Sequence, residues 1–239
     1  MMSKPKRIFT EERLQEFGKG FMFLALEALE KGDIETAKYW CKRNEETKFF
    51  IHDSYLYWVS RILSIIYERW GEDACVSVVK DSVRFASIES FYREKQKMIE
   101  EKGIGAWVEC LVDTWRQHCG SFTVKEDDEK FIVEHKPCGA GGRLVDMQAY
   151  DGPLGFRRLK KADAHTWKKK NLPIYCSHCR WVHEIWPVYL YGEGAQLWVH
   201  ASPFPEKPGD PCIHYVYKNP KKIPEKYYEQ MGMKKSTGE

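Results

Sequence analysis

The chain has 239 residues, 43% of them hydrophobic, and its 38 basic and 35 acidic residues give a formal net charge of +3. This length and composition predict a folded protein of one large or two modest domains, and they exclude a disordered chain. The near balance of charges disfavours nucleic acid as a partner, because a nucleic-acid binder concentrates positive charge on one face. No apolar stretch approaches the length of a membrane span, so we expect no membrane partner.

Eight cysteines are too few in this length for a disulfide scaffold, and the first residues contain no apolar segment of a secretory signal. We therefore expect a cytoplasmic, reducing location, where clustered thiols indicate metal binding or chemistry. The 9 Trp, 13 Tyr and 12 Phe residues serve either core packing or an aromatic-lined pocket for a planar ligand. The sequence leaves the oligomeric state open, a homo-oligomer included.

The first half of the chain carries helical patterns. Thr10 and Asp33 are predicted to cap helices, because each precedes a run with acidic residues in its first turn. Apolar residues at three- and four-residue steps predict the later helices. The expected helices are residues 10–31, residues 33–47, one ending at Gly71, one with Cys75 and Ala86 on the same face, and residues 104–118.

The pattern changes at Gly120, where residues 121–126 begin to alternate with a period of two. We expect a β-hairpin over residues 121–135 and further strands at residues 185–191, 196–200 and 212–218. The predicted fold class is α+β. A helical bundle, residues 1–119, would pack on an antiparallel β region with a Cys/His metal site, residues 120–239, and the two regions could form one integrated domain.

Two cysteines, Cys176 and Cys179, have a C-x2-C spacing that can direct both sulfurs at one centre. Upstream, His135 and Cys138 have an H-x2-C spacing followed by glycine, which resembles a zinc-ribbon knuckle. Three cysteines and one histidine are a donor set typical of zinc. We therefore predict a metal site with the three cysteines as ligands. The alternative is two reduced surface turns with incidental thiols.

The fourth ligand stays open at this level. His135 has the knuckle spacing, His165 precedes the second cysteine turn, and His183 follows Cys179 by four residues. We rank His135 slightly above His165, and zinc above iron or an iron–sulfur cluster. A closed set of four protein ligands is typical of structural zinc, whereas catalysis requires an open position on the metal.

The C-terminal part of the chain has the order paired-cysteine turn, two expected strands, Gly209-Asp210-Pro211-Cys212 and a last strand. Over residues 120–218 this order resembles 4-vinyl-reductase-type domains and the related aminothiazoline-carboxylate-hydrolase-like proteins, which also place G-D-x-C before their last strand. The resemblance implies an α+β domain that holds a small, often cyclic or tetrapyrrole-like ligand. Proteins of this kind are enzymes or ligand sensors.

Histidines near the expected centre are candidates for proton transfer, because imidazole titrates near neutral pH. His118 follows the last helix, and His183 is followed directly by Glu184. Each has a structural alternative: His118 as a core histidine, and the pair as an exposed polar dipeptide. Candidates for substrate binding are Arg143, which would hold a carboxylate, and three tryptophans of an expected cleft between the helical and β regions, Trp115, Trp181 and Trp186.

Together these features predict a zinc-dependent enzyme, of hydrolase or lyase type, that acts on a small aromatic or heterocyclic acid. The second hypothesis is a non-catalytic sensor of a small-molecule ligand in which zinc is structural. The third is a zinc-ribbon nucleic-acid binder, ranked last because the basic patch is small.

Overall fold

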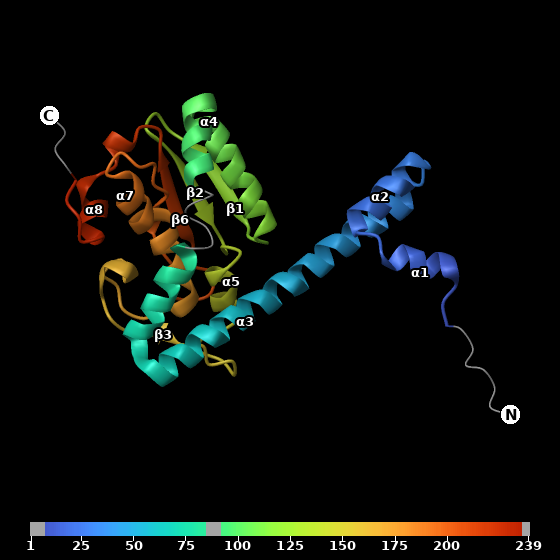
Figure 1. Ribbon diagram of the computed structural model, residues 1–239, viewed down its shortest axis with the longest axis horizontal. Helices are drawn as coiled ribbons and strands as arrows, with labels where there is room; N and C mark the ends of the chain where they lie inside the picture. The colour runs from blue at the N-terminus through green and yellow to red at the C-terminus, as the bar shows by residue number, and fades with distance from the viewer. Residues whose placement is uncertain (1–7, 85–91, 236–239) are drawn as a thin grey trace. The chain divides into compact units, whose positions relative to one another are not determined.

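The computed structural model describes residues 8–84 and 92–235. Contacts divide the chain into two compact units, an N-terminal unit, Met1–Ser54, and a C-terminal unit, Tyr55–Glu239. Figure 1 shows the N-terminal unit in blue, built from helices alone. The domain boundary expected after residue 119 stays a prediction, and each unit is described below by itself.

The N-terminal unit contains α1 (Glu11–Phe17), α2 (Phe21–Glu30) and the first part of α3 (Ile34–Val83). Both predicted caps are confirmed. The Thr10 hydroxyl accepts a hydrogen bond from the Arg13 amide at 3.2 Å, and Asp33 Oδ1 accepts one from the Thr36 amide at 3.0 Å. The single helix expected over residues 10–31 is wrong, because Gly20, with φ −68° and ψ 150°, is extended and separates α1 from α2.

Helix α3 joins two helices that the sequence analysis separated, because residues 44–54 contain no glycine or proline to end a helix. The predicted break at Gly71 is confirmed: φ is 86° and ψ is 177°, a conformation that favours glycine. The helix then continues to Val83 with Cys75 and Val79 buried. Ala86, predicted on the same face, lies outside the described residues.

Helix α4 (Arg93–Gln117) has a similar break at Gly103, and its second part confirms the helix predicted over residues 104–118. Its buried face packs on the sheet. The members of this hydrophobic cluster are Trp107, Val108, Leu111 and Trp115 from α4, and Val133, Trp198 and Val216 from the sheet and its approach. Figure 1 shows α4 in green beside β1 and β2.

The main sheet has four antiparallel strands in the order β1 (Phe122–Glu126), β2 (Lys130–His135), β6 (Cys212–Tyr217) and β5 (Val199–Ser202). The hairpin and the last strand are therefore confirmed, and so is the α+β class. A second, two-stranded sheet pairs β3 (Arg158–Leu159) with β4 (Leu172–Pro173). The strand expected to start at residue 196 begins only at Val199.

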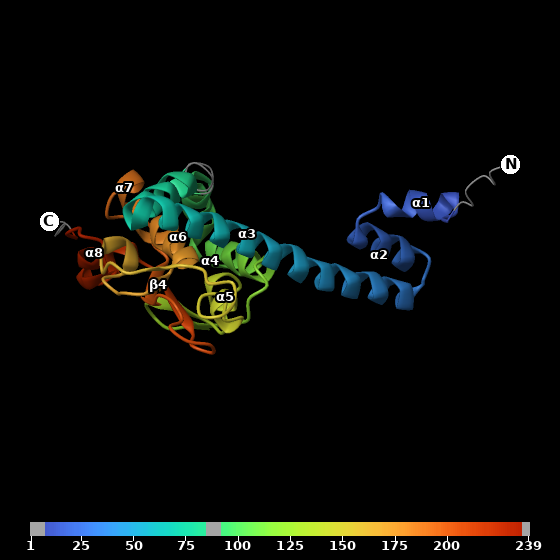
Figure 2. The same cartoon turned by 90° about the horizontal axis from the view of Figure 1, so that it is seen from below.

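The strand expected at residues 185–191 is wrong. The chain is helical from residue 174 to 191, and Figure 2 shows its α6 and α7 in orange. Its buried residues Val182, Ile185 and Val188 follow a three-residue spacing, which puts them on one side of a helix. The elements in order are η3 (Ile174–Cys176), α6 (Ser177–Arg180), η4 (Trp181–Ile185) and α7 (Trp186–Tyr191).

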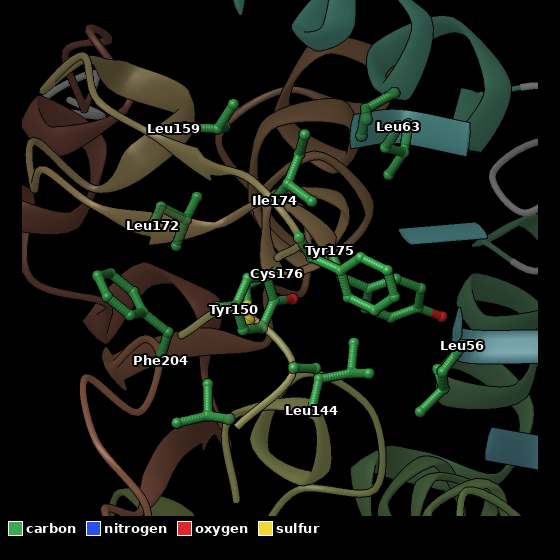
Figure 3. Close-up of a cluster of buried hydrophobic side chains, with 14 of the residues drawn as sticks. Leu56, Leu63, Leu144, Tyr150, Leu159, Leu172, Ile174, Tyr175, Cys176 and Phe204 are labelled. Atoms are coloured by element: carbon green, nitrogen blue, oxygen red, sulfur yellow. The ribbon is translucent and has the colours of Figure 1, made fainter. Parts of the chain in front are cut away.

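The remaining short helices of the C-terminal unit are α5 (Gly141–Asp146), η2 (Ala164–Thr166), η5 (Pro220–Lys222) and α8 (Glu225–Gln230). Figure 3 shows the largest hydrophobic cluster of the described residues, which includes the Cys176 side chain near Tyr150. Among the described residues, none of the helices combines the length and the apolar character that crossing a bilayer requires.

Candidate functional site

The buried face of the main sheet carries three histidines and a cysteine. His135 pairs with Cys212 across β2 and β6, and His200 pairs with His214 across β5 and β6. Residues directly opposite each other in an antiparallel pair share one face, so all four side chains lie on the same side. The His214 ring centroid is 4.8 Å from that of His135 and 4.5 Å from that of His200, and its Nε2 is 3.1 Å from Cys212 Sγ.

The helical segment over residues 174–191 contributes a second group of thiols and imidazoles, which includes His178 and Cys179. His178 Nδ1 lies 2.5 Å from the Tyr175 carbonyl oxygen, which can only accept, so Nδ1 carries the hydrogen. Burial lowers the pKa of His178, which favours the neutral ring. Its Nε2 is then an acceptor, and it lies 3.4 Å from Cys179 Sγ.

Glu184 connects the helical segment to the sheet. Its Oε1 accepts hydrogen bonds from the His200 amide at 2.6 Å and from His200 Nδ1 at 2.8 Å, and its Oε2 accepts one from Trp167 Nε1 at 3.1 Å. Arg180, which is 0% exposed, forms an ion pair with Glu184 and donates its Nε–H to the Ala164 carbonyl at 2.9 Å. Four groups thus contact the carboxylate, and the carboxylate fixes the orientation of the His200 ring.

The orientation of the His200 ring makes its second nitrogen, Nε2, available to accept a proton. Because Nδ1 donates to Glu184, Nε2 is the ring nitrogen that can receive a proton. Nε2 is buried and makes no hydrogen bond of regular geometry among the described residues. Burial lowers the pKa of His200, and the neighbouring Cys179 thiol partly offsets this. Glu184 therefore orients the His200 ring, and Cys179 lies near enough to that ring to influence its pKa.

The cluster contains three further thiols, those of Cys138, Cys176 and Cys212. Burial raises the pKa of Cys138 to about 11 and raises those of Cys176 and Cys212 well above the usual range, so all three are protonated near neutral pH. The glycines that follow Cys138 let the backbone approach two of these thiols closely. The Gly142 amide donates to Cys138 Sγ at 2.9 Å, and a Cβ at Gly141 would come within 2.2 Å of Cys176 Sγ.

The three cysteines predicted as metal ligands lie close enough to influence one another's charge. Nevertheless, within residues 8–84 and 92–235 no group of three or more His, Cys, Asp or Glu side chains is arranged to hold a metal ion. Of the histidines predicted for the fourth position, His135 is buried beside Trp115 and His214, and His165 lies in η2, 4.0 Å from Asp163. The zinc site stays a prediction.

Two of the predicted proton-transfer residues, His118 and His183, are exposed or half-buried, whereas the third, Glu184, is buried within the cluster. His118 is exposed at the C-terminal end of α4, and its charge helps to lower the pKa of His135, to about 4, and that of His183, although burial is the larger cause for both. The half-buried His183 ring lies 4.0 Å from the Trp198 ring and 5.9 Å from the His200 ring, between centroids. Glu184 contacts His200 and Trp167 through its side chain.

The predicted substrate-binding residues lie in three places. Trp115 adjoins the cluster, with its ring 5.2 Å from His135 and 5.0 Å from Trp198. Trp181 and Trp186 instead lie 6.0 Å from each other and share contacts with the Lys80 ammonium group. Arg143 is half-buried in α5, one turn after Cys138.

Four side chains of the cluster are partly exposed at the molecular surface. Cys138, His178, Cys179 and His183 are half-buried, whereas His200, His214 and Glu184 are buried behind them. A small molecule would therefore meet the half-buried thiols and imidazoles first. Two hollows of the surface, one around Trp40 and one along α4, are lined by other residues.

The sequence analysis missed six residues of the cluster, Trp167, His178, Arg180, His200, Cys212 and His214. The alternation of Cys212, His214 and Val216 in the expected last strand could have indicated one shared face. The pairing of that strand with His200 could not be predicted from local patterns, because strand register is a long-range property.

No protein-family model, curated protein or solved structure that was compared matches this chain. The fold and the cluster therefore define the class to which the chain can be assigned: an α+β protein whose C-terminal unit holds a partly buried thiol and imidazole cluster.

Proposed function

We propose that the C-terminal unit is a thiol-dependent hydrolase for a small aromatic or heterocyclic acid. The observation that supports this most strongly is that Glu184 orients the His200 ring, whose pKa the neighbouring Cys179 thiol raises against the lowering effect of burial. A carboxylate that orients an imidazole, which in turn faces a thiol, is the arrangement that activates a cysteine nucleophile. In this proposal Cys179 is the nucleophile, His200 the general base, and Glu184 a positioning residue.

Cys179 is preferred as the nucleophile over the other three thiols of the cluster. It is half-buried and has His178 and His200 as neighbours, so its proton has two acceptors. Burial raises the pKa of each of the other three, which disfavours their reactive thiolate forms. Burial also lowers the pKa of His200, so this ring is neutral near pH 7 and able to accept a proton.

The reaction proceeds in two steps. The Cys179 sulfur forms a bond to the electrophilic carbon while His200 takes the thiol proton and passes it to the leaving nitrogen or sulfur. Water then adds to the same carbon, giving a proton to His200, and the carbon–sulfur bond breaks with return of that proton to Cys179. Neither step changes an oxidation state.

The expected substrate is a planar acid. Trp198 and His200 lie parallel, with ring centroids 6.1 Å apart and an interplanar angle of 5°, and Trp115 adjoins Trp198. Aromatic rings favour contact with a flat ligand. Arg143 is the residue proposed to hold its carboxylate, because a guanidinium binds a carboxylate through two hydrogen bonds.

A panel of small cyclic amides, imidates and thiazolines, each with and without a carboxylate, tests this function by product formation. We expect turnover of one or more of the acids, loss of turnover in Cys179→Ser, and at least about a hundredfold reduction in kcat for His200→Asn. Turnover that survives Cys179→Ser would contradict the proposal.

A metal centre built from Cys138, Cys176 and Cys179 is the second candidate, as a catalytic or a structural site. The Gly142 amide that donates to Cys138 Sγ favours it, because such hydrogen bonds stabilise an anionic sulfur ligand. Elemental analysis of protein purified without added metal distinguishes the candidates. One equivalent of zinc, lost in Cys176→Ser, would favour the metal centre over a free Cys179 nucleophile.

A further inference from the structure

The Cys176 and Cys179 pair has the backbone geometry of a disulfide site. Cys176 has φ −65° and ψ −18°, Ser177 has φ −62° and ψ −26°, and Cys179 lies within α6. In helical backbone the Cα atoms of residues i and i+3 are about 5 Å apart. Disulfides span Cα separations of about 4.4–6.8 Å, so the Cα atoms of this pair are already within range. The Cβ atoms, about 5–6 Å apart at i, i+3 of a regular helix, must approach to about 3.5–4.5 Å when the bond forms.

The two thiols differ in exposure. Cys176 is 5% exposed and belongs to the hydrophobic cluster of Figure 3, whereas Cys179 is half-buried beside two imidazoles. A dissolved oxidant therefore meets Cys179 first, and the inner thiol is left to react with the oxidised product. An outer reactive cysteine with an inner resolving cysteine is the usual arrangement at redox-sensitive sites.

We propose that Cys179 and Cys176 form a reversible disulfide in response to a peroxide, with Cys179 as the oxidised residue and Cys176 as the resolving residue. This inference rests on the proposed function, because the nucleophile of the hydrolase is the thiol that is oxidised. The disulfide removes the nucleophile and so switches hydrolysis off until a dithiol reduces it.

The chemistry balances with hydrogen peroxide as the oxidant. The Cys179 thiolate attacks one peroxide oxygen, the O–O bond breaks, and the products are a sulfenic acid and hydroxide. The Cys176 sulfur then attacks the Cys179 sulfur, the S–O bond breaks, and water leaves with the proton of the Cys176 thiol. In sum, the two thiols lose two electrons and two protons, and one hydrogen peroxide is reduced to two molecules of water.

Cys138 is the competing resolving residue, because Cys179 lies near enough to raise the pKa of Cys138. Its sulfur already accepts a hydrogen bond from the Gly142 amide, and it comes from a different turn, so it lacks the fixed i, i+3 relation. Cys138→Ser is therefore the matched control for Cys176→Ser and Cys176→Ala.

The experiment treats the full-length protein with about one equivalent of hydrogen peroxide, with and without dimedone, and maps all cysteines by mass spectrometry. In the wild type and in Cys138→Ser we expect a Cys176–Cys179 disulfide that dithiothreitol reverses. In both Cys176 variants we expect a Cys179 sulfenic acid, trapped by dimedone. A Cys138–Cys179 disulfide, or a dimedone adduct on Cys179 in the wild type at the same yield as in the variants, would overturn the inference.

Hydrolysis is measured on the same samples, so that the two proposals can fail separately. A Cys176–Cys179 disulfide without loss of hydrolysis would contradict Cys179 as the nucleophile and leave the disulfide site intact. Peroxide-inactivated protein that contains no Cys176–Cys179 disulfide would contradict the further inference and leave the nucleophile intact. Circular dichroism of each variant checks that it is folded.

Discussion

The residue on which the cluster most depends is Glu184, because one buried carboxylate holds an arginine, an indole, a backbone amide and an imidazole. Removing its charge leaves Arg180 buried without its ion-pair partner. Removing one partner of a buried ion pair typically costs about 3–5 kcal/mol. The carboxylate thus stabilises the fold and positions the His200 ring at once.

Glu184→Gln keeps the shape of the side chain and removes its charge. We expect the free energy of unfolding to fall by about 3 kcal/mol, and kcat to fall by more than tenfold because His200 loses its fixed tautomer. Urea denaturation and steady-state kinetics measure the two effects. Glu193→Gln, a half-buried glutamate on the loop after α7, is the control. Equal effects of the two substitutions would contradict the role given to Glu184.

At the scale of elements, the glycine-rich turn after β2 lies close against the C-terminal end of α4. A Cβ at Gly139 would lie 1.5 Å from the His118 carbonyl oxygen, an atom that cannot move without displacing the backbone. The glycine is therefore required by close approach of two backbones, and the turn and the helix end are coupled.

Gly139→Ala is expected to lower the free energy of unfolding by about 3 kcal/mol or more, because the added methyl group collides with backbone. Gly194→Ala is the matched control, since a Cβ at Gly194 would meet no atom within 4 Å. Its effect should stay within about 1 kcal/mol. Similar melting temperatures for the two variants would show that the close approach at Gly139 is absent in solution.

Helices and strands with a clear hydrophobic periodicity could be predicted from the sequence. Features that depend on contacts between distant parts of the chain could not. The hairpin and the second part of α4 were predicted because alternation and three- to four-residue spacing are local signals. The segment at residues 185–191 was assigned to a strand because a short apolar run fits both structures. Likewise, the C-x2-C motif identified Cys179 but gave no indication of His200, 21 residues later, which only the fold brings near it.

At the scale of the whole molecule, several buried imidazoles make stability depend on pH. Burial lowers the pKa of His214 and of His183 well below 6.5 in the folded protein, whereas the unfolded chain has ordinary values of about 6.5. Below about pH 6.5 the unfolded chain therefore binds protons that the folded protein does not. The contribution of these neutral histidines to the free energy of unfolding is therefore fully present above about pH 6.5, and it is lost as the pH decreases below that value.

For His214 alone the expected loss is up to about 1.4 kcal/mol for each pH unit below 6.5. Urea denaturation at pH 7.5 and pH 5.5 measures it, and His214→Asn should reduce the difference between the two pH values. An unchanged difference in that variant would mean that His214 titrates normally in the folded protein.

The central claim is that Cys179 is the activated thiol, and the rate of alkylation of each cysteine tests it most directly. The protein has eight cysteines, and Cys41 is an exposed free thiol that serves as an internal reference. With substoichiometric iodoacetamide at pH 7.5, followed by peptide mapping, the half-buried Cys179 should react faster than Cys41. His200→Asn should slow Cys179 by about tenfold or more and leave Cys41 unchanged. A Cys179 that reacts no faster than Cys41, or that is unaffected by His200→Asn, would contradict the account.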